Sequence, residues 1–413
     1  MTRKLPRVLV GVAATAAVFY MAAGFALSRG KELGPQHAEL DYPPFDFSMG
    51  SIEDYAVYTE AYLKASRGDE LDAFTLENLK PFLLEPGPEC ERLPDGRVSH
   101  GVVLTHGLLD TPYSLRPLGE ALRERCMLVY GLLLPGHGAR PGALLTSSWE
   151  DWAAAEHWAA EQIGVQVDHL LLAGHSAGGA LSVLESARNE DVEALILFAP
   201  ALGIASTARY AQFLTPLGRL FPAAGWFSVA EDSAIYRYES FAFQAIAETW
   251  ALIQNAWSAE HATHRNLPTF AVVSHPDTTV DTDAALAYMA ENTNPASLTL
   301  LYSQHPETET VIGPRVQVLP SADFANGVLG TSHLGLMTPP EHPYYGRDGE
   351  YRNCGHYAET SNEYADCKAG KRNYYGEATQ ENLVQGLVER IAFNPYYDAM
   401  LDELLKFLAN LER

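Results

Sequence analysis

Short apolar runs alternate with stretches of helical spacing through most of the chain. Continuous apolar runs bounded by turn residues are typical of strands buried on both faces, whereas apolar positions three and four apart predict helices. The pattern predicts strands at 81–86, 99–107, 126–138, 167–173, 193–201, 267–277, 297–303 and 315–321. It predicts helices at 51–66, 114–125, 147–164, 180–188, 282–291, 382–393 and 396–413. We therefore expect an α/β fold, with a mostly parallel central sheet and helices on both of its faces.

The alternation stops between about residues 203 and 266, where aromatic residues gather. We expect a mostly helical insertion at 203–266, set between the two parts of the α/β core at 81–202 and 267–413. Residues 31–80 are predicted to form a linker and a helical N-terminal extension. A polar stretch at about 338–376 is expected to be irregular and to lie on the surface.

The first segment of the chain, residues 1–30, has the pattern of a targeting sequence. A basic stretch at 3–7 precedes an apolar run at 8–27, which is long enough to span a bilayer. We favour an uncleaved membrane anchor. A cleaved signal peptide is the alternative, because small residues around Ala26 and Ser28 would permit cleavage. In either case the basic flank keeps the N-terminus inside, and the rest of the chain is exported across the membrane.

Composition narrows the possible partners. Of the 413 residues 47% are apolar, which is ample for a large core, and the formal net charge is −24. A field of that sign repels phosphate groups, and no basic stripe offsets it, so we expect no binding of nucleic acid.

Four cysteines are present, and export would allow them to form disulfides. We favour a Cys354–Cys367 bond, because both residues lie in one polar stretch rich in turn residues. A Cys90–Cys126 bond is the weaker prediction, since Cys126 begins an apolar run and simple burial would also explain it. The Cys and His spacings do not fit a metal site.

The candidate chemistry centres on the run GHSAGG at 174–179, between the predicted strand at 167–173 and the predicted helix at 180–188. A G-x-S-x-G turn between a strand and a helix is typical of a nucleophile elbow, which exposes Ser176 at a sharp turn. The alternative interpretation is a turn of small residues that packs a helix against a sheet.

A serine nucleophile needs a histidine base and a carboxylate that orients the base. In a fold of this kind these residues follow in the order Ser, Asp or Glu, His, each after a strand. Asp277 is the first carboxylate after the strand at 267–277, and His333 follows the last predicted strand. The rivals are Asp281 and Asp283 for the acid, which are suited to capping the next helix, and His305, His342 and His356 for the base.

An oxyanion hole requires two backbone N–H groups. We expect one from Ala177, directly after the serine, and the other from Leu108, in the loop after the strand at 99–107. His106 and Gly107 are expected to shape that loop, and His175 to pack beside the elbow.

With these motifs in place, the chain resembles the monoacylglycerol lipase and carboxylesterase branch of the α/β-hydrolase family. The matching stretches are HGLLDTPYSLRPLGEAL, LLLPGHG, WEDW, GHSAGG, DTTVD and SHLGL, in the family's order between about residues 98 and 336. The resemblance implies an α/β-hydrolase fold and a triad of Ser176, Asp277 and His333. It also implies an oxyanion hole at Leu108 and Ala177 and a cap formed by the insertion.

The sequence therefore predicts an exported serine hydrolase that cleaves carboxylic esters without a cofactor. Its expected partners are a small acyl ester or lipid substrate and, through the N-terminal segment, a membrane. The alternatives are a lysophospholipase or thioesterase, and a membrane-tethered binding protein on a hydrolase scaffold that has no activity of its own.

Overall fold

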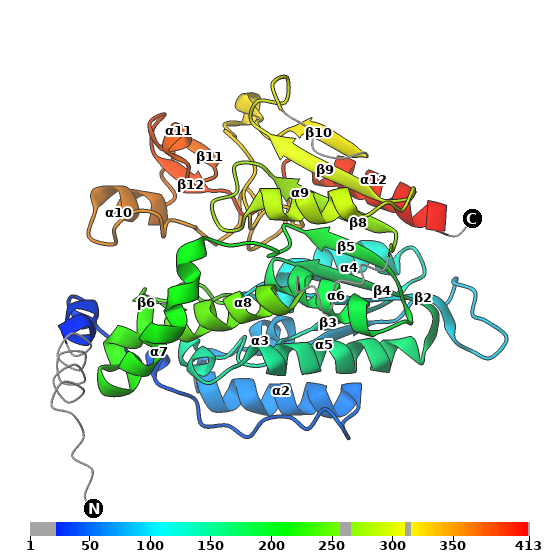
Figure 1. Ribbon diagram of the computed structural model, residues 1–413, viewed down its shortest axis with the longest axis horizontal. Helices are drawn as coiled ribbons and strands as arrows, with labels where there is room; N and C mark the ends of the chain where they lie inside the picture. The colour runs from blue at the N-terminus through cyan, green and yellow to red at the C-terminus, as the bar shows by residue number, and fades with distance from the viewer. Residues whose placement is uncertain (1–21, 257–265, 310–314, 412–413) are drawn as a thin grey trace, which may run out of the picture.

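A computed structural model describes residues 22–256, 266–309 and 315–411. Its centre is a sheet in the strand order β1-β3-β2-β4-β5-β8-β9-β10 (Figure 1). Only β1 runs antiparallel to its neighbour, so the prediction of a mostly parallel sheet is confirmed. These strands are β1 (Phe82–Leu84), β2 (Val98–Thr105), β3 (Leu128–Leu132), β4 (Val167–His175), β5 (Val192–Phe198), β8 (Thr269–Ser274), β9 (Leu298–Ser303) and β10 (Val316–Pro320).

Helices cover both faces of the sheet, because its strands are apolar on both sides and both must be buried. One face packs against α2 (Ile52–Arg67), α5 (Trp149–Gly164) and α6 (Ala177–Arg188). The other face packs against α4 (Arg116–Arg123) and α12 (Tyr397–Leu411).

The segment between β5 and β8 contains α7 (Ala211–Leu220) and α8 (Phe243–Ala256), and α8 packs against α5 and α6. It also contains a short antiparallel pair that the pattern did not predict, β6 (Trp226–Ser228) with β7 (Phe241–Ala242).

The C-terminal part corrects two predictions. The predicted helix at 382–393 is wrong: α11 (Gln380–Leu383) stops after one turn, and β12 (Val388–Arg390) follows. Gly386 has a φ of +148°, which ends the helical pattern, and β12 pairs in parallel with β11 (Tyr374–Gly376).

The polar stretch at 338–376 is only partly irregular and is not confined to the surface. It contains α10 (Asn362–Lys368) as well as β11, and both lie with β12 at one side of the molecule (Figure 1). Tyr344, Tyr345 and Tyr351 are buried there, and they pack with tyrosines of the N-terminal extension and the insertion. The aromatic side chains of this polar stretch therefore form part of a separate, smaller hydrophobic core.

Both predicted disulfides are present, Cys354–Cys367 and Cys90–Cys126. The apolar run at 8–27 lies mostly outside the described residues. Within the part of the chain that the structure describes, no helix is long and apolar enough to cross a membrane. The structure also contains α3 (Ala73–Leu79) and α9 (Thr282–Glu291).

Candidate active site

Ser176 lies at a tight turn between the end of β4 and the start of α6. Its φ of +54° and ψ of −118° are unusual for a residue with a side chain, and the surrounding backbone holds it there. A Cβ on Gly174 would lie 2.3 Å from the backbone carbon of Gly178, and one on Gly178 would lie 2.1 Å from the carbonyl oxygen of Thr105. The turn therefore requires glycine on both sides of the serine.

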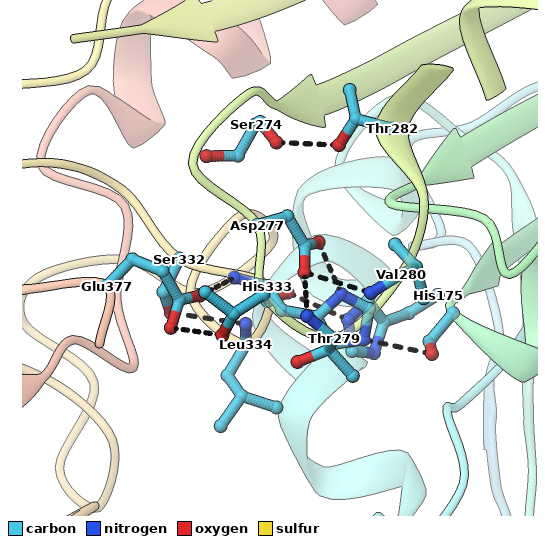
Figure 2. A network of polar contacts seen from close by, with 12 residues as sticks. His175, Ser274, Asp277, Thr279, Val280, Thr282, Ser332, His333, Leu334 and Glu377 are labelled. Carbon is cyan, nitrogen blue, oxygen red and sulfur yellow. Dashed lines mark hydrogen bonds and ion pairs between the residues drawn. The ribbon is translucent and has the colours of Figure 1, made fainter. Parts of the chain in front are cut away.

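The structure brings Ser176, His333 and Asp277 together from three distant parts of the chain. The distance from His333 Nε2 to Ser176 Oγ is 2.9 Å, and that from His333 Nδ1 to Asp277 Oδ2 is 2.7 Å. Figure 2 shows His333 below Asp277, in a network of polar contacts. In this arrangement Nδ1–H donates to the carboxylate, which leaves Nε2 free to accept the serine proton.

Asp277 is held as a carboxylate by its surroundings. Burial raises the pKa of Asp277, but His333 and the N–H groups of Thr279 and Val280 lower it more, and the net pKa lies below its usual value. Both N–H groups donate to Oδ1, at 2.7 and 3.1 Å, while Oδ2 faces His333 (Figure 2). The two oxygens of this carboxylate therefore have separate tasks, one fixing its own loop and one facing the imidazole.

The structure places the rival acids and bases away from Ser176 Oγ. Asp281 caps α9 by accepting from the N–H of Asp283. His305 pairs with Glu381, and His356 Nε2–H donates to the Val388 carbonyl. Buried His342 accepts from the N–H groups of Tyr344 and Tyr345, and burial lowers its pKa to about 4.

His175 contacts the loop that carries His333 as well as the turn around Ser176. Its Nε2–H donates to the carbonyl oxygen of His333 at 3.0 Å. Burial and the proximity of His333 hold the pKa of His175 well below its usual range, so its ring is neutral. This neutral ring ties the residue before the serine to the backbone of His333.

The loop after β2 carries Leu108 and is fixed by His106. The Nε2 of His106 accepts from the N–H of Leu134, and its Nδ1–H donates to the Gly107 carbonyl. Burial lowers the pKa of His106 to about 4, which keeps the ring neutral for these two bonds. Ala177 is the first residue of α6, so its N–H has no partner within the helix. Among the described residues, neither the Leu108 nor the Ala177 N–H has a hydrogen-bond acceptor.

The segment between β5 and β8 is hydrogen-bonded to this same loop. The N–H of Tyr238 donates to the Leu109 carbonyl at 2.8 Å, and Thr111 Oγ1 donates to the Tyr236 carbonyl at 2.9 Å. Changes in this segment can therefore affect the residues next to Leu108.

Sequence reasoning missed Glu377, whose side chain is fully buried beside His333. It lies just after β11, at the end of the stretch predicted to be irregular and exposed. Glu377 is not part of a recognisable motif. Its position near His333 becomes evident only in the folded chain, where the C-terminal segment packs against the loops that carry Asp277 and His333.

A metal site is not evident: across the described ranges, no three His, Cys, Asp or Glu side chains gather as a group that could hold an ion.

Residues 102–343 match the Alpha/beta hydrolase family. A curated relative, the thermostable monoacylglycerol lipase of Bacillus sp. (strain H-257), is 27% identical over 133 residues, which are 32% of this chain and 49% of the relative. The chain thus spans about half the length of the curated relative it matches.

Two solved structures are similar in part. One comes from a study of LipS and LipT, two metagenome-derived lipolytic enzymes. It is 20% identical to this chain, with a TM-score of 0.45, and the match covers 55% of this chain and 87% of the solved chain. The other is a monoacylglycerol lipase of Paleococcus ferrophilus; it is 18% identical, with a TM-score of 0.42, over 55% of this chain and 88% of that one. Since the family match covers more than half of the sequence, the chain belongs to the alpha/beta hydrolase family.

Proposed function

We propose that the protein is an exported serine hydrolase that cleaves carboxylic esters. The observation that carries the proposal is the line of hydrogen bonds from Ser176 Oγ through His333 to Asp277. A hydroxyl is a poor nucleophile at neutral pH, and a neutral imidazole backed by a carboxylate is the group that activates it.

In the proposed reaction Ser176 Oγ attacks the acyl carbonyl while His333 Nε2 takes its proton. The N–H groups of Leu108 and Ala177 stabilise the negative charge that develops on the carbonyl oxygen. His333 then returns the proton to the leaving alcohol, and an acyl-enzyme remains. Water, activated by the same imidazole, releases the acid and restores the serine.

The substrate proposal is a monoacylglycerol or another simple carboxylic ester. The curated relative is named a monoacylglycerol lipase. The segment between β5 and β8, which we propose as a cap, supplies apolar and aromatic side chains of the kind that line acyl sites. A lysophospholipase or thioesterase would use the same machinery on a different leaving group.

A fluorophosphonate probe tests the nucleophile. The folded wild type should be labelled, and Ser176→Ala should not be. Ser206→Ala, at an exposed position, is the control and should be labelled like the wild type. If the folded wild type is not labelled, the protein is a binding protein on a hydrolase scaffold and the proposal is wrong.

A substrate panel tests the bond. Esters, thioesters and lysophospholipids with the same acyl chain should be compared by kcat/KM, and then acyl length should be varied in the best class. We expect the simple ester or monoacylglycerol to lead; a lead for the lysophospholipid or the thioester would support the alternative.

A further inference from the structure

The buried carboxylate of Glu377 contacts both loops that carry the acid and the base. Its Oε1 accepts from Thr278 Oγ1 at 3.0 Å, one residue after Asp277. Its Oε2 lies 3.4 Å from the backbone nitrogen of His333, whose N–H donates to it. Figure 2 shows Glu377 beside His333, away from the Asp277 side of the ring.

Arg390, on β12, completes the contact. Its Nε lies 2.6 Å from Glu377 Oε1, and its Nη2 donates to Glu377 Oε2 at 2.9 Å. Nη2 also donates to Thr279 Oγ1 at 2.6 Å. The pair thus touches two consecutive side chains of the acid loop and the backbone of the base.

A buried carboxylate is costly unless its charge and its lone pairs are matched. Here Arg390 supplies the opposite charge, and Thr278, His333 and the N–H of Ala378 supply further donors. The bonds from Thr278 and His333 join Glu377 to the loops that carry Asp277 and His333, whereas the Ala378 bond is local. Glu377 therefore supports the loops that carry Asp277 and His333.

The pair comes from a part of the chain beyond the family match, which ends at residue 343. The geometry points to a positioning role: we propose that Glu377 and Arg390 form a clip that sets the spacing of Asp277 and His333. This inference rests on the proposed hydrolase function. It adds that the C-terminal segment contributes to the reaction rate.

The main test is Glu377→Gln, with Glu389→Gln as a matched control. Glu389 is also buried, and it lies on β12, next to Arg390. It pairs with Arg372 and Arg352, but it is not bonded to the loop of Asp277 or to that of His333. Each variant removes a buried carboxylate that pairs with arginine, so both should lower the unfolding temperature. Only Glu377→Gln should also lower kcat, by roughly 10-fold to 100-fold with KM nearly unchanged, since small displacements of reacting groups cost rates of that size.

A milder pair of variants guards against loss of folding. Thr278→Val removes the hydroxyl bonded to Glu377 and leaves the Arg390 ion pair intact. Thr278→Ser keeps the hydroxyl and should restore most of the kcat that Thr278→Val loses. The same order should appear in the rate of labelling by a fluorophosphonate.

The outcomes separate the two proposals. If the wild type and Glu389→Gln hydrolyse esters and Glu377→Gln does so equally well at a temperature where all are folded, the clip is wrong and the hydrolase proposal stands. An equal kcat for Thr278→Val and Thr278→Ser also overturns the clip. If the folded wild type neither hydrolyses esters nor reacts with the probe, the hydrolase proposal fails and the clip fails with it.

Discussion

At the residue scale, replacing Asp277 by asparagine is the most direct test of its proposed role. Asp277→Asn keeps the size of the side chain, but its NH₂ group favours the wrong tautomer of His333. Loss of the correct tautomer in a serine triad lowers kcat by roughly 10⁴-fold. We expect a fall of that order for Asp277→Asn, measured as ester hydrolysis at neutral pH. Asp281→Asn is the control, because asparagine caps α9 as well as aspartate does; a comparable loss in that variant would contradict the assignment.

Single residues also show what the sequence alone could predict. Ser176, Asp277 and His333 could be predicted as a triad because each follows a predicted strand in an order that the fold requires. Glu377 follows only a short strand in a polar stretch, and its partners Thr278 and Arg390 are far from it in sequence or separated from it by a turn. Local pattern carries no information about such a contact, which exists only through tertiary packing.

At the scale of elements, α5 carries a buried acid, Glu156, into the space between β2 and α6. Thr105 Oγ1 donates to one of its oxygens and Ser182 Oγ donates to the other, at 3.1 Å in the second case. Burial raises the pKa of Glu156 from 4.5 to about 8, despite these bonds. The neutral acid is therefore the form that the folded protein prefers.

This shift predicts a pH-dependent stability. Because the pKa is higher in the folded state, the contribution of the neutral acid is complete below about pH 4.5 and is lost as the pH rises through about 8. Glu156→Gln removes the titration and keeps a group that can bond both hydroxyls. The unfolding temperature of Glu156→Gln relative to the wild type should therefore rise between about pH 5 and pH 8.5. The exposed Glu150→Gln should show no such trend, and parallel curves for all three proteins would refute the prediction.

Elements differ in how far their pattern determines them. The bounds of α5 and α9 agree closely with the predicted 147–164 and 282–291, because each has a capping residue and a clear apolar face. The predicted helix at 382–393 failed because Val388 and its neighbours pair with β11, and this tertiary contact overrides a weak helical spacing.

At the scale of the whole molecule, the two disulfides should have different effects. In the chain-entropy view, closing loops with sequence separations of 36 and 13 stabilises the fold by about 4 and about 3 kcal/mol respectively. Cys90→Ser/Cys126→Ser and Cys354→Ser/Cys367→Ser should both lower the free energy of unfolding in urea. Only the second pair should also lower kcat, because the carbonyl of Asn353, next to Cys354, accepts from the N–H of Arg390. Equal kcat in both double variants would count against that link.

Residues 1–30 are expected to determine where in the cell the protein is located. Disulfides persist in oxidising compartments, and two of them suggest that the folded part lies outside the cytoplasm. If residues 1–30 form an anchor, the full chain should sediment with membranes at its full mass. A chain lacking residues 1–30, refolded under oxidising conditions, should be soluble and hydrolyse esters at the full-length rate. A soluble wild type whose mass lacks the leader would instead support a cleaved signal peptide. A full-length protein in the cytoplasm with four free thiols would contradict export, since both interpretations require passage across the membrane.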